Sequence, residues 1–230
     1  MFEQAASQYF RLWTFVGRIN REQEPKIHGL GCHLAPGLVL TAAHVYAGTA
    51  TPTVSIDNDV WVCSVAAEWK DRDLAVLRAE RKLKSMGENE RRVHLPYPQL
   101  ARDLPRIGMQ LGCMAWLQFL NQAGESRGRT YFGQGHVAYF DVGEDGQLLF
   151  ALQGTTIEKG FSGGPVFSQD GRLHGVLVQA VQHAPNLHES RLQVDSMALL
   201  SPLAKIAPDI SSLIEGDYPV PELMVEPRPV

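Results

Sequence analysis

Most of the chain alternates between short apolar runs and turn-forming residues. Many runs are rich in β-branched and aromatic residues, and several follow the period of two that places successive side chains on opposite faces of a strand. Runs of this kind before residue 95 are 11–19, 29–34, 37–45, 53–56, 60–69 and 74–79. Later runs are 110–119, 135–142, 147–154, 164–181 and 191–194. The pattern predicts a protein built mainly from β-strands.

Turn chemistry separates the expected strands. Pro36 and Gly37 predict a turn, and the Asx residues within 56–59 predict another, because their side chains hydrogen-bond to their own backbone. Asp170 and Gly171 lie between two apolar runs and predict a hairpin with a type I′ turn, in which both central residues have positive φ. The segment 95–105 is rich in proline and poor in strand signals, so it separates two β-rich halves.

Two stretches have a helical pattern. The first is the lead, residues 1–10, and the second is residues 196–215, with Ser196 as a candidate N-cap and Pro202 marking a late start or the first turn. Residues 216–230 have no periodicity and contain four prolines, which predicts an extended tail or a linker.

Composition narrows the class of protein. The chain has 230 residues, of which 44% are hydrophobic, and a formal net charge of -4, which is typical of a soluble globular protein. Its 21 Lys and Arg against 25 Asp and Glu leave no basic excess, so the attraction that supplies most non-specific nucleic-acid affinity is missing. We therefore expect neither a nucleic-acid partner nor a membrane partner.

The cysteines and the N-terminal residues indicate in which cellular compartment the protein is expected. Cys32, Cys63 and Cys113 lie outside any C-x-x-C pattern and predict buried free thiols, not a disulfide framework or a zinc site. Glu3 stands where a secretory signal has its basic start, and Arg11 interrupts the apolar run, so no signal peptide is expected. These features favour a reducing, cytoplasmic setting.

The sequence GFSGGPVF, residues 160–167, places Ser162 among glycines. Such a serine is a nucleophile elbow of an α/β hydrolase, a nucleophile of another kind, or an ordinary turn residue. An elbow is followed by a helix and then by the acid and the histidine. Here the hairpin at Asp170 and Gly171 follows instead, and the alternation of strands with helices is missing from the chain. The elbow interpretation is excluded.

A histidine and an aspartate that suit a nucleophilic serine lie upstream of Ser162. His44 ends the apolar run LTAAHV, and Asp73 begins DLAVL. The order histidine, aspartate, serine is that of the chymotrypsin-like arrangement. Asp71, two residues earlier, would face the same side of an extended strand and is the local alternative for the acid.

The motifs LTAAHV, RDLAVL and GFSGGPVF resemble the signatures of chymotrypsin-like serine peptidases, and residues 11–205 are similar to the compact bacterial, HtrA-like branch. The resemblance implies an all-β fold of two six-stranded antiparallel β-barrels followed by a C-terminal helix. It places the first barrel, with His44 and Asp73, in residues 11–100 and the second, with Ser162, in residues 101–195. It also implies a polypeptide substrate and no cofactor or metal, and the other histidines, among them His183 and His188, lack the spacing of a metal site.

The resemblance assigns a role to each group. Ser162 would attack the scissile carbonyl, His44 would accept its proton, and Asp73 would orient the imidazole. The backbone N–H groups of Gly160 and Ser162 would form the oxyanion hole. The expected function is a serine endopeptidase that works through a Ser162 acyl-enzyme, as an intracellular regulatory or effector protease. The alternative is a binding module on a protease fold, inactive or active only when a partner orders the oxyanion loop.

The substrate pocket also follows from the resemblance. Its base would be Thr156, and its walls would come from residues 157–159 and from Val178, Gln179 and Ala180. No acid lies at the base, so a preference for Lys or Arg is not expected, and an uncharged P1 side chain of small to medium size is favoured. Lys159 or Arg191 near the rim would instead favour an acidic side chain.

Phe161 departs from the family pattern. The secreted members carry Asp at this position and HtrA-like members usually carry Asn. A phenyl ring cannot pair with the amine that zymogen cleavage releases, so activation by N-terminal insertion is not expected. Whether the oxyanion hole is formed at rest is left open. The proline-rich tail further suggests that the natural protein continues beyond Val230 into a sensing or assembly domain.

Overall fold

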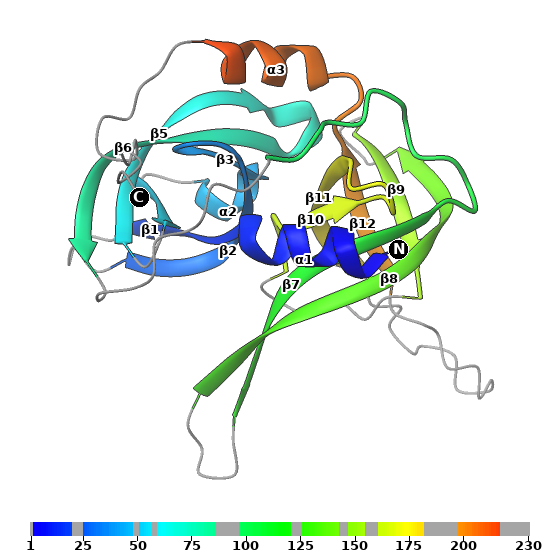
Figure 1. The fold of residues 1–230 in the computed structure, drawn as a ribbon, viewed down its shortest axis with the longest axis horizontal. Helices are drawn as coiled ribbons and strands as arrows, with labels where there is room; N and C mark the ends of the chain where they lie inside the picture. Colours follow the sequence, from blue (N-terminus) through cyan, green and yellow to red (C-terminus); the bar gives the residue numbers. More distant parts are fainter. Residues whose placement is uncertain are drawn as a thin grey trace, which may run out of the picture.

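Two closed β-barrels, each of six antiparallel strands, make up most of the structure (Figure 1). This computed structural model describes residues 2–19, 25–47, 51–56, 59–85, 97–120, 126–142, 147–154, 161–181 and 197–216. A C-terminal helix, α3 (Ala207–Glu215), follows the second barrel. The fold class expected from the sequence is therefore confirmed.

The first barrel lies between residues 13 and 85, within the range 11–100 that the sequence predicts. Its strands are β1 (Trp13–Ile19), β2 (Pro25–Ala35), β3 (Leu38–Ala42), β4 (Thr51–Ile56), β5 (Asp59–Trp69) and β6 (Leu74–Ser85). They close in the order β1, β2, β3, β6, β5, β4. Strand β3 is buried along its whole length, and it also contacts β11 (Leu173–Val181) of the second barrel. Strand β3 therefore lies where the two barrels meet.

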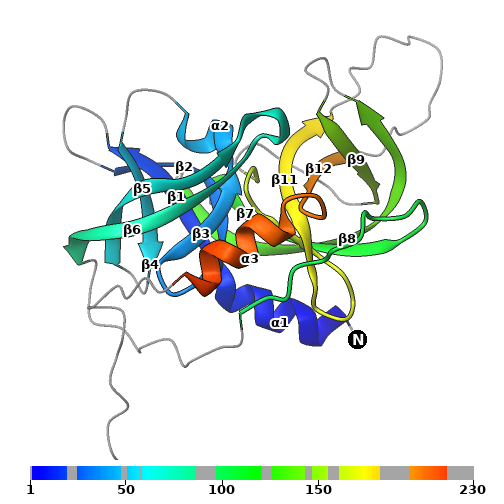
Figure 2. The ribbon, with the colours of Figure 1, turned by 90° about the horizontal axis from the view of Figure 1, so that it is seen from above.

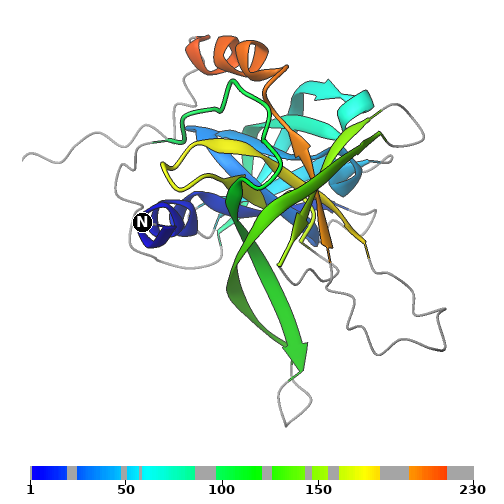
Figure 3. The same ribbon diagram turned by 90° about the vertical axis from the view of Figure 1, so that its right-hand side faces the viewer.

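The second barrel closes in the order β10, β11, β12, β9, β8, β7. Its strands are β7 (Gln110–Leu120), β8 (Ser126–Val142), β9 (Leu148–Gln153), β10 (Pro165–Phe167), β11 (Leu173–Val181) and β12 (Met197–Pro202). Strands β7 and β8 pair from Gln110 and His136 to Leu120 and Ser126, and their far ends extend away from the barrel as a two-stranded ribbon (Figure 3).

The helix expected over residues 196–215 is wrong in its first part. Residues 197–202 form strand β12, and the second barrel therefore extends beyond residue 195. A short apolar run fits a strand as well as a helix. Here the pairing of β12 with β9 and β11 decides, because it closes the barrel and buries Ala198 and Leu200. Pro202 ends this strand, and α3 begins only at Ala207, near the junction of the two barrels (Figure 2).

The N-terminal lead is helix α1 (Phe2–Leu12), two residues longer at its C-terminal end than the sequence predicts. Its buried face includes Phe2 and Tyr9. The Tyr9 ring stacks on Phe167 of β10 with centroids 4.1 Å apart, and its hydroxyl donates to the Gly171 carbonyl at 3.0 Å. Burial raises the pKa of the Tyr9 phenol well above its ordinary value, so the hydroxyl remains a donor. Helix α1 thus packs on the β10–β11 hairpin.

The β10–β11 hairpin is confirmed, but its turn is not type I′. Gly171 has a φ of 82°, but the φ of Asp170 is not positive. Among the non-glycine residues of the described ranges, only Asp73 has a positive φ. Gly171 N–H donates to the Ser168 carbonyl, and Ser168 N–H donates to the Arg172 carbonyl, both at 3.0 Å. This is a longer loop with one residue in the left-handed region. The Asp170 carboxylate accepts from the Ser168 hydroxyl, which stabilises the loop without positive φ at Asp170.

The three cysteines are buried free thiols, as predicted. Burial raises the pKa of Cys63 to about 12 and also raises that of Cys32, so both thiols are protonated at neutral pH. None of the described helices has the length and apolar character needed to cross a membrane.

Candidate active site

His44 lies on a short helix, α2 (Ala43–Tyr46), that follows β3 directly. The neighbours of His44 on this helix are buried, and Ala43 N–H donates to the Asp73 carbonyl at 2.9 Å. Tyr46 donates its hydroxyl to Glu68 of β5 at 2.7 Å. The helix is therefore fixed from both sides, while the His44 side chain is 47% exposed.

Asp73 has an unusual backbone. It lies between a single 3-10 turn (Lys70–Arg72) and strand β6, with φ 52° and ψ 41°. This left-handed conformation costs about 1–2 kcal/mol for a residue with a Cβ, and Asp tolerates it better than most. The conformation directs the Asp73 side chain back toward α2.

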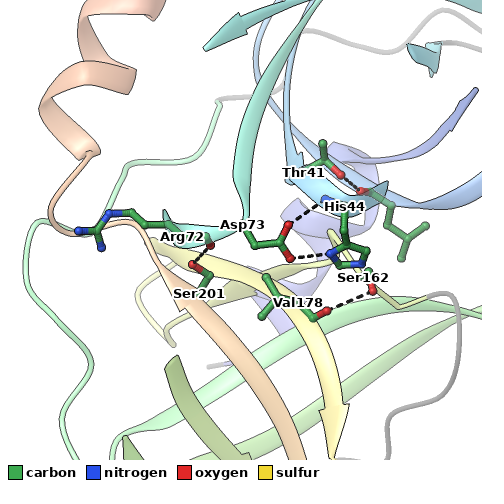
Figure 4. A network of polar contacts seen from close by, with 8 residues as sticks. Thr41, His44, Arg72, Asp73, Ser162, Val178 and Ser201 are labelled. Carbon is green, nitrogen blue, oxygen red and sulfur yellow. Dashed lines mark hydrogen bonds and ion pairs between the residues drawn. The ribbon is translucent and has the colours of Figure 1, made fainter. Parts of the chain in front are cut away.

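The Asp73 carboxylate contacts His44 at two points (Figure 4). Oδ1 accepts the backbone N–H of His44 at 2.8 Å, and Oδ2 lies 2.5 Å from His44 Nδ1. In a neutral imidazole with its proton on Nδ1, Nε2 is the acceptor. Asp71, the alternative, is 68% exposed at its side chain and pairs with Arg72 at 3.7 Å. The structure therefore brings Asp73 to His44.

Ser162 enters the site from the second barrel, in the turn that precedes β10. Its carbonyl accepts the N–H of Leu30 in β2 at 2.8 Å, so a backbone hydrogen bond joins the turn of Ser162 to the first barrel. Its hydroxyl donates to the Val178 carbonyl at 3.4 Å, and the side chain lies beside the His44 ring on the side away from Asp73 (Figure 4). The three residues expected from the motifs thus lie together at the barrel junction.

The model of the trypsin-like peptidase domain matches residues 29–176. The chain belongs to this family. It is therefore a serine protease, a hydrolase, as its resemblance to chymotrypsin-like peptidases implies. No curated protein sequence matches the chain.

Two solved structures share the fold of this trypsin-like peptidase. One is the serine endoprotease of Yersinia pestis, with 18% identity, a TM-score of 0.60, and coverage of 94% of this chain and 67% of that one. The other is a protease of M. tuberculosis in its active form, with 17% identity, a TM-score of 0.61, and coverage of 94% and 86%. At these identities the likeness is one of fold.

Gly163, directly after Ser162 in this trypsin-like peptidase, leaves no room for a side chain. Its φ is 85°, and a Cβ there would lie 1.8 Å from the Leu30 carbonyl oxygen and 2.6 Å from Thr41 Oγ1. The Gly163 N–H donates to the Leu177 carbonyl at 2.7 Å, so the turn has little freedom to move away. The close approach of the two barrels at this point requires glycine.

We expect Gly163→Ala to destabilise the protein clearly more than Gly108→Ala, as measured by urea unfolding. Gly108 is a matched control, because its φ is 81° but a Cβ there would meet nothing within 4 Å. The control carries only the backbone cost of about 1–2 kcal/mol. Equal losses of stability in the two variants would contradict the close barrel contact at Gly163.

Phe161 holds the turn of Ser162 through burial. Its side chain is 1% exposed, and its ring lies 5.8 Å from that of Tyr131 in β8 at an interplanar angle of 27°. It packs in one apolar cluster with Leu30, Val166 and Leu177, and its carbonyl accepts the N–H of Gly164 at 3.0 Å. The turn is therefore held by apolar packing, without a polar side chain at position 161. Residues 155–160 lie outside the described ranges, so the oxyanion hole stays a prediction.

Phe161→Asp is expected to lower the free energy of unfolding by several kcal/mol, since an unpaired carboxylate would replace a buried ring. Phe161→Leu, the matched apolar change, is expected to cost about 1–2 kcal/mol. Urea denaturation of both variants measures the difference. A Phe161→Asp protein as stable as Phe161→Leu would show that the ring's burial does not hold the turn.

The expected substrate pocket is only partly described. Val178 is 7% exposed, and its carbonyl accepts from Ser162. Gln179 and Ala180 continue strand β11, where they pair with Leu199 and Ala198. Thr156, residues 157–159, His183, His188 and Arg191 lie outside the described residues. The pocket and its P1 preference stay predictions. Within the described ranges, no group of three potential metal ligands is present.

The sequence analysis did not single out two residues, Thr41 and Ser201, whose hydroxyl groups form hydrogen bonds near the site. Thr41 Oγ1 donates to the Leu30 carbonyl at 2.6 Å, and Ser201 Oγ donates to the Arg72 carbonyl at the same distance. Thr41 had a signal, because it is a polar residue within the otherwise apolar stretch GLVLTAA. Ser201 had none, since its partner lies 129 residues away in the chain.

Proposed function

We propose that this chain is a serine endopeptidase that cleaves polypeptides through an acyl-enzyme on Ser162. The observation that carries the proposal is the two-point contact of the Asp73 carboxylate with His44, with Ser162 beside the same ring. A carboxylate that orients a histidine next to a hydroxyl is the arrangement that activates a serine nucleophile.

The proposed reaction runs in two halves. Ser162 Oγ forms a bond to the scissile carbonyl carbon as its proton passes to His44 Nε2, and Asp73 stabilises the imidazolium. The imidazolium then gives the proton to the leaving amine, and the C–N bond breaks to leave an ester. In the second half, water attacks the ester carbonyl as its proton passes to His44 Nε2. The ester C–O bond then breaks, which releases the carboxylic acid product and regenerates the Ser162 hydroxyl. Backbone N–H groups of Gly160 and Ser162 would bind the oxyanion, each contributing about 10²–10³ in rate.

The alternative of an inactive binding module is less well supported. A module needs only the surface of the fold, whereas the left-handed backbone of Asp73 has an energetic cost that its contacts with His44 explain. Burial of Phe161 also stabilises the nucleophile turn without a partner. We retain Thr156, Val178, Gln179 and Ala180 as the proposed substrate pocket.

The setting is a second part of the proposal. Three buried free thiols in one protease suit a reducing compartment, so we propose a cytoplasmic location and an intracellular regulatory or effector role. A sensing or assembly domain after Val230 stays a prediction, and residues 217–230 lie outside the described part of the chain.

A fluorophosphonate probe tests the central claim. The probe phosphonylates a serine only when a neighbouring base activates it, so the wild-type protein is expected to be labelled at Ser162, located by mass spectrometry of the digested protein. Ser162→Ala is the control and should remain unlabelled. A folded wild-type protein that is unlabelled under every condition tried would overturn the enzyme proposal.

A further inference from the structure

A buried hydroxyl of the second barrel reaches the acid of the proposed triad through one peptide group. Ser201 lies on β12, is 0% exposed, and donates its hydroxyl to the Arg72 carbonyl at 2.6 Å (Figure 4). Arg72 ends the 3-10 turn of the first barrel and directly precedes Asp73. The hydrogen bond therefore joins the two barrels at the Asp73 segment.

The acceptor of this hydrogen bond, the Arg72 carbonyl, belongs to the peptide group that joins Arg72 to Asp73. The φ angle of Asp73 is the rotation about its N–Cα bond, which joins the Arg72–Asp73 peptide group to the Asp73 Cα, and its value of 52° is unfavourable for a residue with a Cβ. Such a conformation persists only where surrounding contacts hold it. On the first barrel, the N–H of Asp73 donates to the Lys70 carbonyl at 3.2 Å. Ser201 supplies a shorter contact to the same peptide group from the opposite barrel.

Strand β12, which carries Ser201, pairs with β11, and β11 contacts Ser162. In this pairing, Val176 of β11 lies opposite Ser201 of β12. Val178 lies two residues further along β11, and its carbonyl accepts a hydrogen bond from the Ser162 hydroxyl. The β11–β12 pair thus contacts the nucleophile at one point and the Asp73 segment at another.

We propose that Ser201 is a positioning residue, which acts through the Arg72 carbonyl to hold Asp73 against His44 in register with Ser162. This inference rests on the proposed function, because it assigns a part in the same reaction. Ser201 touches no reacting atom. Its effect is to keep the carboxylate oriented while substrate binds at the barrel junction.

The test is a double-mutant cycle on kcat, with Ser201→Ala introduced into the wild type and into Asp73→Asn. In the wild type we expect kcat to fall about tenfold with KM nearly unchanged, as loss of one hydrogen bond to the positioned peptide implies. In Asp73→Asn we expect no further loss, because the oriented carboxylate is already gone. An equal loss in both backgrounds, or none in the wild type, would overturn the positioning role.

Ser168→Ala is the matched control. Ser168 is also a buried serine of the second barrel whose hydroxyl is bonded, but it lies in the loop at the other end of β10. This variant is expected to lose stability in urea without a change in kcat. Should Ser201→Ala not fold, Ser201→Cys places a weaker donor of similar shape there, and the same cycle applies.

The cycle separates the two proposals. If fluorophosphonate does not label the wild-type protein and Asp73→Asn has no effect on hydrolysis, the proposed function itself fails. If the wild type is labelled and Asp73→Asn is slow, but Ser201→Ala behaves alike in both backgrounds, only the role of Ser201 is overturned.

Discussion

Replacing Ser162 by alanine is expected to lower kcat for peptide hydrolysis by about 10⁶. The reason is that no other group takes over the nucleophilic step, so only binding and oxyanion stabilisation would remain. The measurement is steady-state cleavage of fluorogenic peptides, chosen from a peptide library profiled with the wild-type protein. That profile also tests the expected preference for an uncharged P1 side chain.

The structure predicts that Ser162→Ala leaves the fold intact. The backbone bonds of the turn, from Leu30 N–H to the Ser162 carbonyl and from Gly163 N–H to the Leu177 carbonyl, do not involve the removed hydroxyl. Urea denaturation should therefore give a stability close to that of the wild type. A folded Ser162→Ala protein that cleaves the same peptides at the wild-type rate would show that the hydrolysis has another source.

Asp73→Asn is expected to lower kcat by about 10⁴ at neutral pH. Asparagine has nearly the same shape and also tolerates the left-handed backbone, so the change is mainly one of charge and hydrogen bonding. An amide NH₂ beside His44 Nδ1 would favour the tautomer with its proton on Nε2, which cannot accept the proton of Ser162. The measurement is kcat for peptide cleavage over a range of pH.

Asp71→Asn is the matched control for this charge change. Asp71 lies two residues before Asp73, but its side chain is 68% exposed and pairs with Arg72 at 3.7 Å. An exposed pair of this kind contributes little, so kcat should stay close to that of the wild type. If Asp71→Asn were the slow variant and Asp73→Asn the normal one, the assignment of the acid would be reversed.

The sequence predicted the β fold and its two halves because those depend on patterns within single strands. The alternation of side chains, the turn residues and the hairpin at residues 170 and 171 are local features. The prediction of a helix from residue 196 was wrong because distant contacts decide the structure there. Residues 197–202 form a strand because β9 and β11 lie on either side of them, although their own apolar pattern also suits a helix.

The candidate site divides in the same way. The sequence alone determined which candidate groups are present and in which order, since His44, Asp73 and Ser162 each lie in a short motif on the expected kind of element. The motif already favoured Asp73 over Asp71, but only the tertiary structure decided how its carboxylate contacts His44, that the Phe161 ring anchors the turn of Ser162, and that Ser201 bonds to the peptide before Asp73. The physical reason is that these contacts join residues far apart in the chain, whose positions depend on barrel closure and packing and leave no pattern in either segment alone.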